Sequence, residues 1–316
     1  MISLVRRGVL CLALLLLLAA AVACQEEEAR PATPTPTPVG ATQAQFPLTI
    51  GDDLGRQVTL PAAPQRIVSL SAGATEIFFA IGAGQQVIAV DRFSDFPAEA
   101  RIRPQLDAFQ PSVEAIAGLQ PDLVLMFFDP GGVVDGLERV GSTVLFLDAP
   151  ESVDGVLEQI RLLGRVTGHV PQAEALIQSM QARIDAVGKK LADVPQGPRI
   201  FHEVDATLYT AAPNSFVGDL YTILRAQNIA AGAAQAYPQL SQEVIIERDP
   251  EVIILADEAY GESPQTVKAR AGWSSISAVK SDRIYSIDPN IVSRPGPRLV
   301  EALETLARLL YPEKFR

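Results

Sequence analysis

The sequence predicts an α/β protein with two Rossmann-like lobes, each built on a parallel central sheet, joined by a single long helix. Three observations lead to this prediction. Strand and helix patterns alternate from residue 66 onward, which is typical of parallel sheets covered by helices. A helical stretch without strand character, Gln172–Leu191, stands between two such blocks. The two blocks also repeat one another.

The N-terminus has the pattern of an export signal. Arg6 and Arg7 precede an apolar run, Val9–Ala23, that is too short for a stable membrane span. The run ends in AVAC, which looks like a bacterial lipobox and predicts cleavage before Cys24 and lipidation of its thiol. The alternative is a plain secretory signal followed by a chance cysteine. We therefore expect a lipoprotein signal peptide at 1–23 and an extracytoplasmic chain that is lipid-anchored to a membrane of the cell envelope.

A segment rich in proline and threonine follows the cysteine. Residues 24–45 offer little apolar surface to bury, and their alternating Thr-Pro tract favours extended polyproline geometry. A semi-rigid tether of this kind makes sense when its upstream end is fixed. Because one acyl chain gives only marginal anchoring, the two or three chains of a lipoprotein would be needed to hold it.

Composition excludes several classes of function. The two cysteines, Cys11 and Cys24, lie within or next to the signal, so we expect no disulfide and no cysteine-ligated metal in the globular part. The formal net charge of −11 argues against a nucleic-acid partner. The sequence contains no HExxH and no GxSxG motif, and its one Gly-Ala-Gly follows a helix instead of a strand. We expect no catalytic residue, no metal site and no cofactor.

The N-terminal lobe is expected at 46–150. It opens with a hairpin at 48–60, whose turn surrounds Asp53 and Gly55. Period-two and buried-type runs then alternate with helical runs. The expected strands are 66–70, 86–90, 122–128 and 142–147, and the expected helices are 74–82, 112–118 and 133–140.

A connecting helical region at 151–197 leads into a C-terminal lobe at 198–316. The connecting region breaks near Thr167–Pro171, and its second piece is the candidate spine between the lobes. A rigid spine implies small motion of one lobe relative to the other. In the C-terminal lobe we expect strands at 199–204, 251–255 and 283–287, and helices at 215–226, 241–247, 264–270 and 297–310.

The internal repeat is seen in PSVEAIAGLQPDLVLM, which starts at Pro111, and LSQEVIIERDPEVIIL, which starts at Leu240. Six positions correspond at one constant offset of 129 residues. Each segment has a serine as helix N-cap, a glutamate in the first turn and a Pro-acidic turn into a buried strand. One such unit could arise by convergence, but six positions in register favour two related lobes.

Aromatic residues follow the carboxyl ends of several expected strands. Ligands of open parallel sheets bind outside those ends, so a cleft between the lobes is expected there. Each aromatic taken alone is more often a core residue. The set consists of Phe93, Phe96, Phe127, Phe128, Tyr209 and Tyr260.

In combination, three segments resemble the helical-backbone solute-binding proteins that serve ABC importers of cobalamin, haem and iron–siderophore complexes. They are LTIGDDLGRQVTLPAAPQRIVSLSAGATEIFFAIG, PSVEAIAGLQPDLVLM and SRPGPRLVEALETLARLLYP. The resemblance runs from about Phe46 to the C-terminus. It implies two α/β lobes joined by one long helix, a monomer, and a permease dimer as partner.

Within the family the pattern is most similar to the cobalamin-binding members, which implies a corrinoid ligand; haem or a ferric siderophore is the alternative. Tryptophans of that pattern are replaced here by Phe or Tyr, and an acidic partner of the cleft arginine becomes Asn290. Aromatic character is kept, so stacking on a flat macrocycle stays possible. The residues implied for ligand binding are Ser71, Ala72, Gly73, Phe93, Phe96, Phe109, Phe127, Tyr209, Tyr237 and Arg294.

Glu114 and Glu243 correspond to a pair of docking glutamates that engage arginines of the permease. Independently of the resemblance, two carboxylates in repeat-related positions suit a two-fold partner. Each would also interact favourably with its helix N-terminus.

Two other functions stay open at this point. An exported, chelatase-like enzyme would use His202, Glu203 and Asp205 at a strand end to hold a metal or to move protons. A protein-interaction module without a small ligand would have a filled, dry surface between its lobes.

Overall fold

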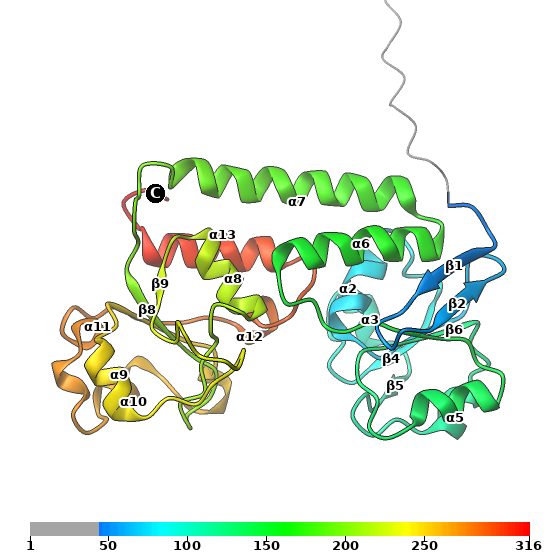
Figure 1. Cartoon of the computed structure of the whole chain (residues 1–316), viewed down its shortest axis with the longest axis horizontal. Coiled ribbons are helices and arrows are strands. Elements are labelled where there is room, and N and C mark those ends of the chain that lie inside the picture. Colours follow the sequence, from blue (N-terminus) through cyan, green and yellow to red (C-terminus); the bar gives the residue numbers. More distant parts are fainter. Residues whose placement is uncertain (1–43) are drawn as a thin grey trace, which may run out of the picture. The chain divides into compact units, whose positions relative to one another are not determined.

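The computed structural model describes residues 44–316 (Figure 1). The expected signal peptide, Cys24 and nearly all of the tether lie outside the described residues. A hairpin opens the described part, with β1 (Leu48–Gly51) paired antiparallel to β2 (Gln57–Leu60). The Asp53 N–H in its turn donates to the Phe146 carbonyl over 3.1 Å, which joins the hairpin to the first sheet.

The first sheet has five parallel strands in the order β5-β4-β3-β6-β7. Its central strands are buried throughout, because helices cover both faces. The α2 helix packs on one face, and α4 and α5 pack on the other. The elements are β3 (Ile67–Ser69), α2 (Ala72–Ala80), β4 (Val87–Asp91), α3 (Ala98–Arg101), β5 (Gln105–Leu106), α4 (Val113–Gly118), β6 (Leu123–Met126), α5 (Val133–Arg139) and β7 (Val144–Phe146).

The second sheet has four parallel strands in the order β11-β10-β8-β9. Helices α8 and α13 cover one face, and α9, α10 and Trp273 cover the other. The elements are β8 (Arg199–Glu203), α8 (Phe216–Ile223), β9 (Gln227–Asn228), α9 (Gln242–Arg248), β10 (Val252–Leu255), η1 (Glu258–Tyr260), α10 (Pro264–Lys268), η2 (Trp273–Ser275), α11 (Ser277–Lys280), β11 (Ile284–Ser286), α12 (Pro289–Val292) and α13 (Leu299–Leu310).

The two sheets confirm the predicted fold class. The repeated segments fold alike, as α4 followed by β6 and as α9 followed by β10. Their serines act as N-caps: the Ser112 hydroxyl accepts from the Ala115 N–H over 3.1 Å, and the Ser241 hydroxyl accepts from the Val244 N–H over 3.4 Å. Each cap satisfies one of the free donors of the first helical turn.

The predicted spine is α7 (Val170–Lys190), which follows α6 (Val153–Thr167) and lies along both α6 and α13 (Figure 1). Gly164 permits the close approach of α6 to α7, because a Cβ there would lie 2.4 Å from the Cβ of Ala173. One continuous apolar cluster includes side chains of both sheets and of α2, α6, α7, α8 and α13. The lobes therefore share a packed core, which resists motion of one against the other. Within residues 44–316 no helix is both long enough and apolar enough to cross a membrane.

A buried acidic cluster fixes the loop that follows β10. Arg270 forms a two-pronged ion pair with Glu203 at the end of β8 and a second ion pair with Glu262 at 2.7 Å. Asp257 is fully buried beside Glu203, and neither of its carboxyl oxygens has a donor among the described residues. Burial, together with the charges of Glu203 and Glu262, raises the pKa of Asp257 to about 7. In its protonated form Asp257 can donate a hydrogen bond to Glu203.

Replacing Asp257 with asparagine tests this cluster. A folded pKa of about 7 against an ordinary value of 3.8 means that this carboxyl stabilises the fold at low pH, and that the contribution is lost as the pH rises through about 7. Between pH 5 and pH 8 the wild type should lose on the order of 2 kcal/mol more free energy of unfolding than Asp257→Asn does. Urea unfolding at the two pH values measures this, with exposed Asp135→Asn as control. The same pH dependence in wild type and Asp257→Asn would contradict the assignment.

Candidate ligand-binding site

A cavity of about 370 Å³ lies between the two sheets at the carboxyl ends of their strands. Ser71 and Phe127 reach it from just beyond β3 and β6, and Val204 and Ala256 reach it from just beyond β8 and β10. Residues 289–295, which follow β11, close another side. We call this space the interlobe cavity. Its place at the carboxyl ends of parallel strands is the usual place for a ligand in an open α/β sheet.

A second space of about 400 Å³ shares Ala72 and Phe127 with the interlobe cavity. Phe93, Phe109 and Phe127 line this second space, and the Phe109 ring centroid lies 5.8 Å from that of Phe93, 6.1 Å from that of Phe127 and 5.7 Å from that of Phe128, which packs behind it. We call this second space the phenylalanine recess. Edge-to-face contacts hold Phe109 to Phe93 and Phe127, and a tilted contact holds it to Phe128. Ring surface stays exposed, since Phe93 is 47% and Phe109 44% accessible.

Local structure around β4 holds Phe93 in this position. The buried Asp91 carboxylate accepts from the Phe93 N–H over 2.7 Å and from the Ser94 hydroxyl over 2.5 Å. The Ser94 hydroxyl also contacts the Thr75 hydroxyl of α2 at 2.9 Å. This chain of buried hydrogen bonds ties the turn after β4 to α2, and burial raises the pKa of Asp91.

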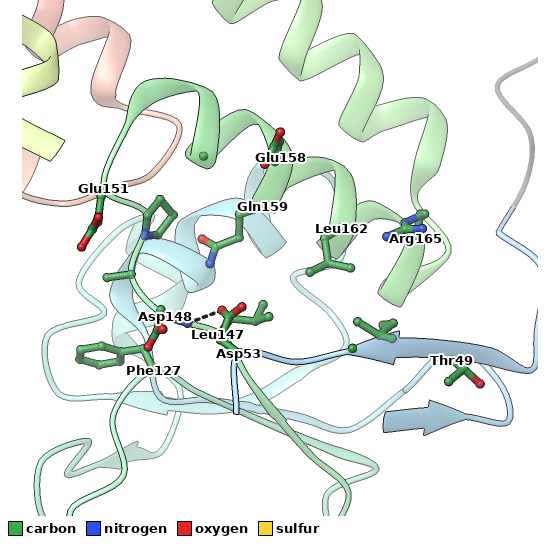
Figure 2. A pocket seen from close by; sticks show the side chains of 15 residues that line it. Thr49, Asp53, Phe127, Leu147, Asp148, Glu151, Glu158, Gln159, Leu162 and Arg165 are labelled. Carbon is green, nitrogen blue, oxygen red and sulfur yellow. Dashed lines mark hydrogen bonds between the residues drawn. The ribbon is translucent and has the colours of Figure 1, made fainter. Parts of the chain in front are cut away.

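A third and more polar space of about 1040 Å³ adjoins the interlobe cavity on the side of α6 (Figure 2). The two spaces share Phe127, Ala149, Pro150 and Gln159. We call this third space the acidic groove, because Asp53, Asp148, Glu151 and Glu158 line it. Arg165 lies at the opposite end of the groove from Phe127 (Figure 2). Burial and the charges of Asp53 and Glu151 raise the pKa of Asp148.

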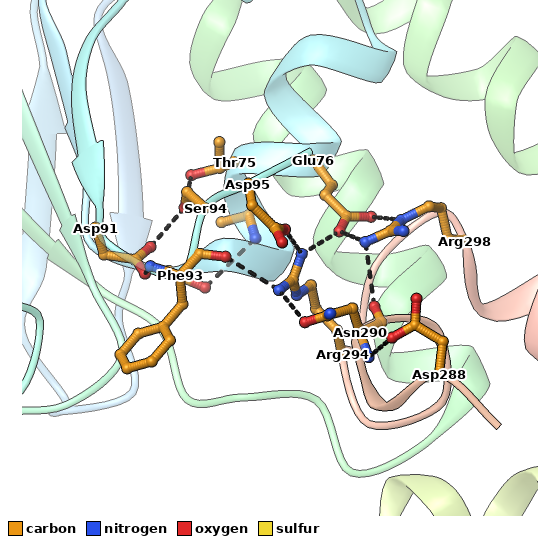
Figure 3. A network of polar contacts seen from close by, with 12 residues as sticks. Thr75, Glu76, Asp91, Phe93, Ser94, Asp95, Asp288, Asn290, Arg294 and Arg298 are labelled. Carbon is orange, nitrogen blue, oxygen red and sulfur yellow. Dashed lines mark hydrogen bonds and ion pairs between the residues drawn. The ribbon is translucent and has the colours of Figure 1, made fainter. Parts of the chain in front are cut away.

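Two arginines of the segment after α12 cross to the N-terminal lobe and meet there (Figure 3). Arg294 donates to Glu76 over 2.9 Å and to Asp95 over 2.8 Å, and Arg298 donates to Glu76 over 2.6 and 3.0 Å. The Glu76 side chain is 2% exposed. We call these four residues the interlobe bridge. The contact extends to the backbone, because a Cβ at Gly73 would lie 2.5 Å from the Pro295 carbonyl oxygen.

Both terminal nitrogens of Arg294 are hydrogen-bonded to protein groups. Besides Glu76 and Asp95, it donates to the Phe93 carbonyl over 3.0 Å and to the Asn290 side-chain oxygen over 2.9 Å, and its side chain is only 11% exposed. Burial alone would raise the pKa of Asp95, but the hydrogen bond and charge of Arg294 outweigh it, and the pKa of Asp95 is lowered. Asp95 is thus held as a carboxylate against the guanidinium.

The structure places seven of the ten expected ligand-binding residues, Arg294 among them, around the interlobe cavity and the phenylalanine recess. Ser71, Ala72, Gly73, Phe127 and Arg294 line the interlobe cavity, and Ala72, Phe93, Phe109 and Phe127 line the phenylalanine recess.

The other three expected residues lie elsewhere. Phe96 lines a separate space with Phe79 and Pro297, and the Arg298 guanidinium stacks on its ring at 4.2 Å. Tyr209 pairs with Gln239 in an isolated bridge and is 40% exposed. Tyr237 is 43% exposed, and neither tyrosine lines the interlobe cavity or the recess.

Glu114 and Glu243 occupy equivalent positions in the two lobes. Each lies in the first turn of its helix, α4 or α9, and each is exposed. The Ser112 hydroxyl contacts Glu114 at 3.2 Å. Hydrogen bonds from its own backbone N–H and from Ser241 lower the pKa of Glu243.

His202, Glu203 and Asp205 do not converge on one point. The fully buried His202 places Nδ1 2.8 Å from the Tyr221 hydroxyl, and burial lowers its pKa to about 4. Glu203 pairs with Arg270, and Asp205 accepts from the Thr207 N–H over 2.8 Å. Among residues 44–316, no group of three His, Cys, Asp or Glu side chains is arranged to hold a metal ion. The geometry is that of a packed histidine next to a structural ion pair.

Glu76, Asp95 and Arg298 were not predicted from the sequence. A signal was present, because Glu76 is the single charged residue in the otherwise apolar stretch AGATEIFFA, and such a residue needs a buried partner. That partner could not be identified from the sequence, because Glu76 and its arginines are more than two hundred positions apart.

Known proteins share this architecture. The profile of a family described as periplasmic binding protein matches residues 67–291. A Bacillus subtilis protein named as an uncharacterized ABC transporter substrate-binding lipoprotein is 32% identical, over 86% of this chain and 88% of its own. A cobalamin-binding protein of Halobacterium salinarum is also 32% identical, over 84% of this chain and 74% of its own. The periplasmic haem-binding protein of Roseiflexus in its apo form has a TM-score of 0.71 and 26% identity, covering 79% of this chain and 99% of that one.

These matches extend over both lobes and the spine, and the matching proteins are binding proteins, not enzymes. The chain is accordingly a solute-binding protein of the kind that works with ABC transporters. It belongs to the periplasmic binding protein family.

Proposed function

We propose that this protein is the extracytoplasmic receptor of an ABC importer, and that it captures a corrinoid between its lobes and delivers it to the permease. The observation that carries the proposal is the phenylalanine recess beside the interlobe cavity, with which it shares Ala72 and Phe127. The cobalamin-binding relative at 32% identity supports the choice of a corrinoid. Haem is the alternative in the same role, supported by the structural similarity to a haem-binding protein, and a ferric siderophore is the other.

Flat apolar surface is what suits this site to a macrocycle. Phe93, Phe109 and Phe127 line the phenylalanine recess, and Phe127 lines the interlobe cavity as well. A macrocycle placed there would bury its faces against these rings, while side chains such as Gln159 and Asn290 would hydrogen-bond its rim. Capture at about 10 nM requires roughly −11 kcal/mol, which a few hundred Å² of aromatic burial and some hydrogen bonds can supply.

Anchoring through Cys24 is part of the proposal. The lipobox-like AVAC and the Thr-Pro tract that follows it support it, as does the Bacillus subtilis relative named as a lipoprotein. A tethered monomeric receptor stays near its permease without needing affinity for lipid headgroups, which suits a chain of net charge −11.

Docking is assigned to Glu114 and Glu243. Their exposure and their equivalent places on α4 and α9 suit a permease dimer that presents one arginine-bearing surface to each lobe. Charge pairs at the rim of an interface mainly set orientation and association rate, so these carboxylates need no buried partner in the free receptor.

Titration of the mature protein with cyanocobalamin tests the ligand assignment. We expect saturable binding, and we expect Phe109→Ala to weaken it about 10- to 100-fold, because Phe109 contacts the three other rings of the wall. The control is Phe315→Ala, since Phe315 packs on Lys190 far from the cavity. Haem and ferric siderophores are titrated in parallel, and absence of binding to all three ligand classes would remove the proposal.

Uptake in cells tests the docking assignment. The double variant Glu114→Ala with Glu243→Ala should lose at least about 90% of transport while its ligand affinity stays at the wild-type value, because both carboxylates lie away from the cavity. The matched control is Asp135→Ala with Glu247→Ala, which removes two exposed acids from neighbouring helical positions. Normal uptake by the first double variant would show that these glutamates do not dock.

A further inference from the structure

The walls of the site carry almost no available positive charge. Arg294 is the one charged residue that lines the interlobe cavity, and Asp91 is the one that lines the phenylalanine recess, counted over residues 44–316. In the acidic groove, four carboxylates face a single arginine, Arg165 (Figure 2). An incoming ligand therefore meets a surface that is neutral or negative except at Arg294 in the interlobe cavity and at Arg165 at one end of the groove.

Arg294 itself has few free hydrogen-bond donors. Its two terminal nitrogens make four hydrogen bonds, two of them to the carboxylates of Glu76 and Asp95 (Figure 3). Its Nε–H is the remaining donor. The carboxylates of Glu76 and Asp95 offset the positive charge of Arg294, and they are shared with Arg298 and with the exposed Arg101, which lies 3.9 Å from Asp95.

One other arginine lies close to the aromatic wall. Arg92 stacks on Phe93 with 5.2 Å between its guanidinium carbon and the ring centroid, and it pairs with Asp107 at 3.1 Å. It faces solvent and does not line either cavity. Its ion pair is exposed and contributes little, so Arg92 serves as the natural comparison for Arg294.

Apart from Arg294, the polar side chains that line the interlobe cavity are uncharged. They are the hydroxyls of Ser71, Tyr260 and Ser293 and the carboxamides of Gln159 and Asn290. Hydroxyls and carboxamides both donate and accept, so they match a ligand rim made of amides. They cannot compensate a carboxylate that has been taken out of water.

We propose that the site selects its ligand by charge: it accepts a macrocycle with a rim of neutral amides and rejects one with a rim of carboxylates or other anionic groups. The selection comes from Glu76 and Asp95, which neutralise the single arginine of the cavity, and from the carboxylates of the groove. This inference rests on the proposed function and narrows it, because it distinguishes among the chelates that the receptor role leaves open.

The test compares two corrinoids that share ring and axial ligands. Dicyanocobinamide has amides on its rim, and dicyanocobyrinic acid has carboxylates in the same places. At low ionic strength we expect dicyanocobinamide to bind at least about 100-fold more tightly, and we expect added salt to narrow the ratio, since salt screens the repulsion. Binding is measured by titration calorimetry on the full mature protein.

Two matched variants locate the effect. Asp95→Asn removes one carboxylate from Arg294, and it should shift the affinity ratio about tenfold toward the carboxylate-rimmed corrinoid. Asp107→Asn does the same for the exposed Arg92, keeps an Oδ1 acceptor for the N–H groups of Phe109 and Gln110, and should leave the ratio unchanged. Thermal unfolding establishes that both variants are folded.

The outcomes are distinct. Equal affinity for the two corrinoids, or tighter binding of dicyanocobyrinic acid or haem, would overturn charge selection and leave the receptor function standing. A shift with Asp107→Asn and none with Asp95→Asn would move the role from Arg294 to Arg92 and overturn the mechanism. Failure of both corrinoids and of cyanocobalamin to bind would remove the corrinoid assignment itself.

Discussion

The interlobe bridge is the contact on which the geometry of the site depends. Glu76 lies almost completely buried on α2 of the N-terminal lobe and accepts hydrogen bonds from Arg294 and Arg298 of the opposite lobe. A carboxylate in such a place is tolerated only because both guanidinium groups compensate it, and removing one member of such a set typically costs about 3–5 kcal/mol. The bridge meets the cavity on one side, while α6, α7 and α13 join the lobes through a shared apolar core. Between these two attachments the distance across the cavity is fixed.

The same contact also determines the chemistry of the cavity. An arginine at the mouth of a ligand site usually suggests recognition of an anion. Here the hydrogen bonds of Arg294 go to protein groups, so its function is to position residues 290–298 and, through the Phe93 carbonyl, the turn that carries Phe93. Rigidity and the neutral lining of the cavity therefore have one origin. A preformed, apolar and uncharged space binds a flat ligand without a large ordering cost.

Much of the fold could be predicted because its signals are local. Strand and helix alternation, the serine caps at Ser112 and Ser241 and the strand-free run of α7 all depend on neighbouring residues. The short elements α3, β5, β9 and α12 were not predicted, because they lack the buried apolar runs from which the equally short β3 and β10 were predicted. Phe127 was predicted because ligands bind outside the carboxyl ends of parallel strands, whereas Ser71 was predicted from the family resemblance. The interlobe bridge could not be predicted, because it joins residues about two hundred positions apart. Tyr209 and Tyr237 do not line the cavity, because the backbone around Tyr209 pairs with the backbone around Tyr237.

Pulsed electron–electron double resonance measures the distance between two spin labels, and one label on each lobe tests most directly whether the lobes are held at a fixed separation. Residues 44–316 contain no cysteine, so Asp135→Cys on α5 and Gln265→Cys on α10 place one exposed label on each lobe. The account predicts one narrow distance distribution that shifts by less than about 2 Å when cyanocobalamin is added. A broad distribution in the free protein, or a shift of several Å on binding, would show that the bridge and the shared core do not hold the lobes at a fixed separation.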